Sequence, residues 1–208
     1  MSLVVVLADA ELELRPAGGT GEACTFADLP VLDAFFHREA VRGMPDGERR
    51  GRPDIVHQCL ALCQGSLLNR QGRLRTFVHT RDDRVIAVDP RARVPPNYVE
   101  FLLAMGRLLR GEVVEGFSVA DGTFRQLIER VAADRVVALT PEGQEMDLSA
   151  VLSSPGTTVA VMGAFPCGDY RSPVYELADL QVSLGPELMT VPAVLSEVLA
   201  AAPRGRPR

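Results

Sequence analysis

Three short runs of uninterrupted apolar residues constrain the fold of this chain most strongly. LVVVLA occupies residues 3–8, VVAL residues 136–139 and VAVM residues 159–162. Runs of this length without polar alternation are typical of strands that are buried on both faces. Such strands belong mainly to parallel sheets that helices cover on both sides. The sequence therefore predicts an α/β fold with a mostly parallel sheet.

The segments between these strands show helical spacing or hairpin signals. Helices are expected over about 25–43, over Asp54–Gln64, over about 98–109 and from about 124 onward, and a hairpin over Leu74–Thr80 and Arg84–Val88. The first helix is the least regular of these, because it rests on a stripe of Leu29, Leu32 and Phe36 behind a possible cap at Thr25. Gly43 would end that helix.

Composition points to a protein of a reducing compartment. Among the 208 residues, 47% of them hydrophobic, no uncharged run approaches the roughly 20 residues of a membrane span. The N-terminus meets acidic residues too early for a secretory signal, so a soluble, cytoplasmic protein is expected. Four cysteines without such a signal favour free thiols. Cys59 and Cys63 stand one helical turn apart and are interpreted as core thiols, not zinc ligands.

The charge of the chain is unevenly distributed. The formal net charge is -5, and every one of the 22 basic residues is an arginine. Ten arginines and only four acids fall between Arg49 and Arg93. A solvated arginine-rich face explains such a segment as readily as contact with a polyanion, so charge alone does not decide.

Familiar catalytic motifs do not account for the chain. Gly163 and Gly168 follow a predicted strand, where glycine lets a ligand approach the backbone, but their spacing does not fit G-x-G-x-x-G. The lack of lysine excludes a Walker phosphate loop and a lysine Schiff base. His37, His57 and His79 do not pair by spacing with cysteine or acid, so no metal site is expected, and His57 is interpreted as a structural hydrogen-bonding residue.

Longer strings carry a more specific signal. RGRPDIVHQCL, LLNRQGRLRTFVHT and VDPRARVPPNYVEFLLAMGRLL in the first half, with VMGAFPCGD and VSLGPELMTVPAVLSEVL in the second, closely resemble the pseudouridine-N1-methyltransferases of small-subunit ribosomal RNA. The match covers most of Arg50–Ala202. This family belongs to the SPOUT superfamily, so the resemblance implies a knotted α/β fold with a C-terminal trefoil knot and an N-terminal and central extension. It implies one domain over 1–208, with an RNA-binding extension at about 44–97 and a cofactor-binding knot at about 136–202.

The resemblance also implies S-adenosylmethionine as the cofactor, held by three loops of the knot mainly through backbone groups. The matching positions are Leu139, Gly163, Gly168, Val182, Ser183, Leu184, Gly185, Pro186 and Glu187. Members of the family often carry an aromatic residue at the position of Gly185. Side-chain packing on the cofactor is therefore expected to be weaker here, while backbone recognition is kept.

For RNA, the family uses an arginine steadied by an aspartate two residues later, which here are Arg52 and Asp54. Such a pairing orients the guanidinium for a phosphate or base contact. Asp54 either orients Arg52 or accepts a proton, and the resemblance favours the orienting role. A further family arginine corresponds to Arg93. Two others are replaced by Pro96 and Glu100, which predicts weaker binding with a flatter salt dependence.

The implied activity is methyl transfer to N1 of a pseudouridine in small-subunit rRNA by a homodimer that functions in ribosome biogenesis. Two other readings stay open at this stage. A ribosome-assembly protein would bind pre-ribosomal RNA and use the knot as a dimer scaffold, without needing the cofactor. An unrelated nucleotide-binding enzyme would prefer a dinucleotide to S-adenosylmethionine.

Overall fold

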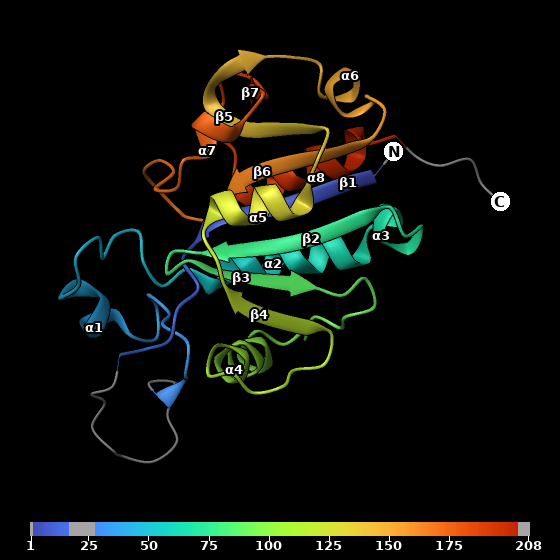
Figure 1. Cartoon of the computed structure of the whole chain (residues 1–208). Coiled ribbons are helices and arrows are strands. Elements are labelled where there is room, and N and C mark those ends of the chain that lie inside the picture. The colour runs from blue at the N-terminus through green and yellow to red at the C-terminus, as the bar shows by residue number, and fades with distance from the viewer. Residues whose placement is uncertain (1, 17–27, 204–208) are drawn as a thin grey trace.

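The computed structural model describes residues 2–16 and 28–203, and one seven-stranded sheet runs through it (Figure 1). The strands are β1 (Ser2–Ala10), β2 (Leu74–Thr80), β3 (Arg84–Val88), β4 (Phe117–Asp121), β5 (Arg135–Glu145), β6 (Thr157–Gly163) and β7 (Leu180–Ser183). Their order is β4-β3-β2-β1-β6-β5-β7. The neighbours β2–β1, β1–β6, β6–β5 and β5–β7 pair in parallel. The pairs β2–β3 and β3–β4 are antiparallel. The mostly parallel sheet is confirmed.

Helices lie on both faces of this sheet (Figure 1). They are α1 (Arg38–Arg42), α2 (Pro53–Gly65), α3 (Leu67–Arg70), α4 (Tyr98–Leu109), α5 (Phe124–Val131), α6 (Leu148–Leu152), α7 (Val174–Leu177) and α8 (Val191–Ala201). In β1, Leu3, Val5 and Leu7 pack in one core layer with α2, α4, α6 and α8. Val4 and Val6 pack in the other layer with α5 and α7. Burial on both faces explains why β1 is apolar at every position from Leu3 to Ala8.

Several predicted elements agree closely with the structure. The expected hairpin is formed by β2 and β3. The expected second helix is α2, which begins at Pro53, and the first position of a helix is one where proline is tolerated. The helix α3 and the edge strand β4 were not predicted. Cys59 and Cys63 are buried thiols, as expected, and burial raises the pKa of both, that of Cys63 to about 12. Cys24 and Thr25 lie outside the described residues.

The helix expected over about 25–43 is wrong over most of its described length. Only Arg38–Arg42 is helical, although the helix does end at Gly43. Val31 instead forms an antiparallel bridge with Leu14. Asp33 explains the interruption, because its carboxylate accepts hydrogen bonds from the backbone of Phe35 and Phe36, a local turn that competes with a helix.

Candidate cofactor and RNA site

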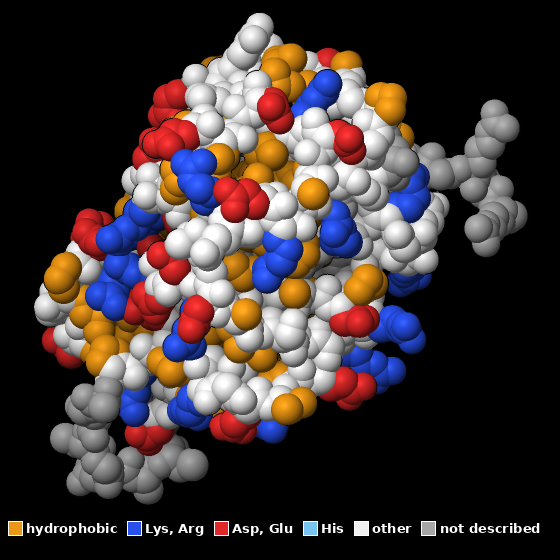
Figure 2. Space-filling view, viewed as in Figure 1, with side chains coloured by type: hydrophobic (Ala, Val, Ile, Leu, Met, Phe, Trp, Pro, Cys, Tyr) orange, Lys and Arg blue, Asp and Glu red, His pale blue; other side chains and the backbone are white. Residues whose placement is uncertain are grey.

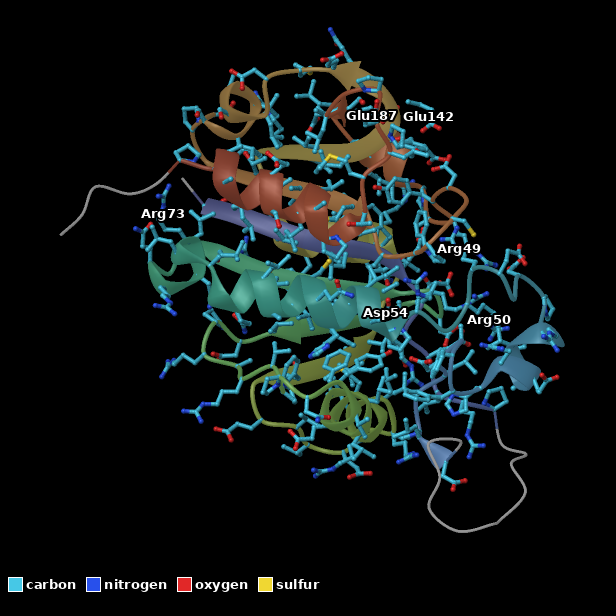
Figure 3. All side chains as sticks on the ribbon, turned by 180° about the vertical axis from the view of Figure 1, so that it is seen from behind. Arg49, Arg50, Asp54, Arg73, Glu142 and Glu187 are labelled. Atoms are coloured by element: carbon cyan, nitrogen blue, oxygen red, sulfur yellow. The ribbon has the colours of Figure 1, made fainter. Side chains whose placement is uncertain are left out.

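The nine positions expected to hold a cofactor lie at the bulge within β5, at and after the end of β6, and at and after the end of β7. These three strands are neighbours in the sheet and run in the same direction, so the loops after them emerge at one edge. In Figure 3, Glu142, Glu187 and Arg49 lie on the same side of the molecule, while Arg73 marks the opposite end of the sheet. The sheet therefore brings together three loops that are far apart in the sequence.

The first loop is a bulge within β5. Leu139 and Gln144 both pair with Val182 of β7, so the residues between them leave the ladder. A Cβ at Gly143 would lie 2.7 Å from the backbone of Val182, which means that only glycine permits this approach. The bulge was not predicted, although the proline and the glycine two residues apart in TPEG are a turn signal.

The second loop contains Gly163 and Gly168. Gly168 has a φ of +80°, a conformation that favours glycine. Tyr170, a little further along, donates a hydrogen bond of 2.9 Å from its hydroxyl to the carbonyl of Leu139. Burial raises the pKa of Tyr170, so this hydroxyl keeps its proton. The bond ties the second loop to the first, a contact that sequence reasoning did not predict.

The third loop, Val182–Glu187, leaves the sheet after two buried residues. Its turn is stabilised by Ser183, whose hydroxyl lies 3.1 Å from the carbonyl of Gly185 and 3.3 Å from its amide. Gly185 has a φ of +133°, and a Cβ there would meet no atom within 4 Å. Pro186 and Glu187 are exposed, whereas Leu184 lines a cavity of about 670 Å³ against α6 and α8. The loops thus offer open, glycine-rich backbone, which fits a cofactor held by main-chain groups.

Arg52 and Asp54 form the pair that the sequence predicted. Nε and Nη2 of Arg52 donate to the two carboxylate oxygens of Asp54, each over 2.8 Å. This fork raises the pKa of Arg52, which therefore stays charged. Both side chains are about one-third exposed, so the pair can be reached from solvent. The Nη1 edge of the guanidinium points away from Asp54 and can contact a ligand.

Backbone bonds place this pair beside the second loop. The amide of Arg52 donates to the carbonyl of Glu11 over 3.1 Å, and the amide of Glu11 donates to the carbonyl of Ala164 over 3.2 Å. Ala164 directly follows Gly163. Glu11 therefore links the backbone of Arg52 to the start of the second loop through two hydrogen bonds. The structure therefore joins the expected RNA contact to the expected cofactor loops.

Arg49 adds a second connection that the sequence did not reveal. Its Nε donates to Glu11 over 2.7 Å and its Nη1 to the carbonyl of Asp169 over 2.5 Å. The guanidinium carbon lies 3.8 Å above the ring of Phe165, in a cation–π contact. Because Phe165 and Asp169 belong to the second loop, Arg49 fixes that loop to the segment that leads into Arg52.

Asp9 anchors the same loop from β1. Its carboxylate accepts hydrogen bonds from the amides of Arg171 and Ser172 and from the Ser172 hydroxyl, over 2.6 to 3.0 Å. Burial by itself would raise the pKa of Asp9. The neighbouring His79 and the bonds from Ser172 and Arg171 outweigh burial and lower this pKa to about 2.

Arg93 lies apart from this group. It lines a cavity of about 780 Å³ between the turn after β3, α4 and the segment before β4. The turn is attached to α2 through His57, whose Nε2 lies 2.7 Å from the carbonyl of Pro95, so the structural role expected of His57 is confirmed. Glu100 occupies the first turn of α4, where a negative charge stabilises the helix but repels phosphate.

Comparison with known proteins now identifies the family. The family model of the EMG1/NEP1 methyltransferases matches residues 5–202. The chain belongs to this family. It is 35% identical over 209 residues to the ribosomal RNA small subunit methyltransferase Nep1 of Methanothrix thermoacetophila, covering 94% of this chain and 92% of that protein. It is likewise 35% identical to Nep1 of Pyrococcus furiosus, over 96% of this chain and 95% of the relative.

A solved structure gives the same result. The crystal structure of Archaeoglobus fulgidus Nep1 bound to S-adenosylhomocysteine matches with a TM-score of 0.80 and 29% identity, over 97% of each chain. The expected fold, the knotted SPOUT type of α/β fold, and the expected enzyme class are thereby confirmed. The ligand of that neighbour is S-adenosylmethionine without its transferable methyl group, in agreement with the predicted cofactor. No helix in the described part of the chain is long and apolar enough to cross a membrane.

Proposed function

We propose that this chain is an S-adenosylmethionine-dependent methyltransferase that acts in the cytoplasm on N1 of a pseudouridine in small-subunit rRNA. The observation that carries the proposal is the Arg52–Asp54 fork, held by backbone bonds next to the glycine loop of a chain in the EMG1/NEP1 family. A methyl donor in the loops and a base presented to Arg52 would meet at this edge of the sheet.

The three loops serve as the cofactor site in this proposal. Leu139, Gly163, Gly168 and Val182–Glu187 would contact the cofactor through backbone groups, with the β5 bulge completing the wall. When bound, S-adenosylmethionine supplies a methyl group on a positively charged sulfur. The protein contributes alignment, because Arg49, Tyr170 and Asp9 hold the first and second loops in one arrangement.

Arg52 and Asp54 would act on the base. N1 of pseudouridine is free to be methylated, since the sugar is attached to carbon. As the bond between N1 and the methyl group forms, the bond between that methyl group and sulfur would break, and the N1 proton would pass to solvent. Arg52, which stays charged, stabilises the negative charge that develops on the base. Asp54 already uses both oxygens on Arg52, so orientation of the guanidinium is its proposed role.

Residues 44–97 would carry the RNA, with Arg93 as a phosphate contact remote from the chemistry. The target base is accessible only in an unpaired loop, because side chains do not reach base edges in the narrow groove of A-form RNA. Pro96 and Glu100 supply no positive charge to this surface. Binding is therefore expected to depend less steeply on salt than in a relative that has arginines there.

A homodimer is part of the proposal. α2 and α8 lie side by side on one face of the molecule (Figure 3). Leu62 of α2 and Leu188 and Met189 before α8 are exposed apolar side chains. Association of two copies through this face would bury them. Sedimentation analysis of the purified chain would give the mass of a monomer if this part of the proposal is wrong.

The decisive experiment combines the protein, S-adenosylmethionine and two rRNA stem-loops that differ only in having pseudouridine or uridine at the target position. Mass spectrometry should find one added methyl group on the pseudouridine RNA alone, since N1 of uridine is bonded to ribose. Calorimetry with S-adenosylmethionine addresses the assembly-factor alternative, to which Gly185, Pro96 and Glu100 give some weight. A protein that binds the RNA tightly but neither binds the cofactor nor methylates would establish that alternative.

A further inference from the structure

Phe35 is an aromatic side chain that the proposed reaction does not use. Its side chain is 74% exposed, and it is the one aromatic ring among the large exposed hydrophobic residues in 2–16 and 28–203. The adjacent Phe36 packs against the core instead, with its ring centroid 5.4 Å from that of Phe35. Figure 2 shows hydrophobic side chains at the surface in the region where Figure 1 labels α1, beside basic and acidic ones. An exposed ring of this size is a candidate binding element.

The turn that carries Phe35 is firmly held. Asp33 accepts hydrogen bonds from the amides of Phe35 and Phe36 over 2.8 and 3.1 Å. Its other carboxylate oxygen accepts a hydrogen bond from the hydroxyl of Tyr98 in α4, and the amide of Asp33 donates to Nδ1 of His37 over 2.9 Å. The exposure of Phe35 is therefore built into an ordered turn, which keeps the entropic cost of binding low.

This turn also lies against the segment that positions Arg52. The amide of Ala34 donates a hydrogen bond of 2.8 Å to the carbonyl of Gly51. Phe35 directly follows Ala34 and Arg52 directly follows Gly51, so this bond joins the two segments next to both residues. Gly51 has a φ of +68°, and a Cβ there would lie 2.8 Å from the Ala34 amide nitrogen. The pKa of Arg52 is raised mainly by its hydrogen bonds to Asp54, and the negative charge of Asp33 adds to this shift in the same direction.

We propose that Phe35 stacks on an unpaired base of the RNA next to the base that Arg52 receives. The inference rests on the proposed function, because it takes RNA as the ligand of this edge. Single-stranded RNA is commonly bound by aromatic rings that stack on splayed bases beside arginines. A flat ring on a fixed turn that is hydrogen-bonded to the segment carrying Arg52 matches that chemistry. A bound protein chain would be served better by a broad apolar patch.

The test compares Phe35→Ala with Phe35→Trp, which keeps a flat ring, and with Val113→Ala, which removes an apolar side chain that is 89% exposed on a different segment. The probe is a pseudouridine-containing rRNA stem-loop, and binding is measured by fluorescence anisotropy at several salt concentrations. Loss of one stacked base should weaken RNA binding roughly 5- to 100-fold. The salt slope should not change, because no charge is removed. Phe35→Trp should restore binding, and Val113→Ala should match the parent.

Calorimetry with S-adenosylmethionine and turnover at saturating RNA complete the design. Both should be unchanged in Phe35→Ala, with KM for RNA raised and kcat kept. Parent-like RNA binding by Phe35→Ala overturns the inference while leaving the proposed function intact. A change of oligomeric state in Phe35→Ala also overturns it, because the ring would then contact a second copy. If the parent itself neither binds nor methylates the RNA, the proposed function fails first and this inference with it.

Discussion

Asp54→Asn separates a role in orienting Arg52 from a role in stability. Asparagine can accept from Nε of Arg52 through its one oxygen, but its amide group cannot accept from Nη2, so half of the fork is lost. The pair is about one-third exposed, and pairs of this kind contribute about 0.2–1 kcal/mol to stability. Loss of a negative charge from the first turn of α2 adds about 0.3–1 kcal/mol. At about 2–4 °C for each kcal/mol in a chain of this size, Tm should fall by no more than about 8 °C.

Asp54→Asn should have only this modest effect on stability but a large effect on the rate of methyl transfer. A guanidinium that is no longer fixed at both ends is misplaced for the base, and misplacement by about 1 Å can lower a rate about 100-fold. We therefore expect kcat/KM of Asp54→Asn to fall between about 10- and 100-fold at a temperature where the variant is fully folded. Glu112→Gln is the matched control. It breaks an exposed ion pair between Glu112 and Arg107, whose charged atoms lie 2.9 Å apart, and leaves the Arg52–Asp54 pair in place. It should keep full activity.

The pH profile then distinguishes orientation from proton transfer. If Asp54 only orients Arg52, the ratio of parent to variant rates should be constant across pH. If Asp54 accepts the N1 proton, the variant should recover as rising pH deprotonates the base without help. An Asp54→Asn variant that retains at least half of the parental kcat/KM would refute the reasoning for either role.

Three further predictions concern the loops. Gly143→Ala forces a Cβ against the β7 backbone and should lower stability by about 1–3 kcal/mol and weaken cofactor binding in calorimetry, whereas Gly65→Ala, with open space at its Cβ, should not weaken binding. Asp9→Asn should lower stability at neutral pH by roughly 2 kcal/mol, because the parental pKa is lowered. The difference in stability between the parent and Asp9→Asn should persist above the pKa of an aspartate in the unfolded chain, near 4, and vanish as pH falls toward 2. Thermal melts at several pH values test this, and a difference that does not change with pH would contradict it. Cys167, exposed in the second loop, should react with a thiol reagent and be protected by S-adenosylmethionine, while Cys59 stays unreactive in the native protein; equal Cys167 labelling with and without cofactor would argue against this loop.

The sequence was informative where burial imposes a periodic pattern. The apolar runs of β1, β5 and β6 and the spacing of α2, α4 and α5 follow directly from which faces are buried. The edge strand β4 was missed because only its first residue is buried and FSVAD carries little strand signal. The false helix before α1 arose from an apolar spacing that Asp33 overrides with local hydrogen bonds.

The site divides in the same physical way. Matched strings predicted Arg52, Asp54 and the loop glycines as site residues, and the pairing of Arg52 with Asp54 is local enough to predict. Arg49 could not be assigned from the sequence, because its partners Glu11 and Asp169 lie 38 and 120 residues away. The knot is equally invisible to periodicity, since threading changes neither burial nor spacing.

Charged side chains are buried between the segment that leads to Arg52 and the second loop. Their desolvation opposes folding, so stability of the fold does not by itself explain why charged residues occupy these positions. Glu11 is fully buried and receives both Arg49 and Arg81, each over 2.7 Å, and Arg50 pairs with the neighbouring Glu13. Taking such groups out of water costs several kcal/mol for each ion, which the attraction between them often only offsets. Apolar residues would fill the same space as stably. A charged junction does what an apolar one cannot, because its fixed directions hold the segment that leads to Arg52 and the second loop at one mutual angle. For a reaction in which a base and a methyl group must align, that fixed angle is the contribution we assign to this network.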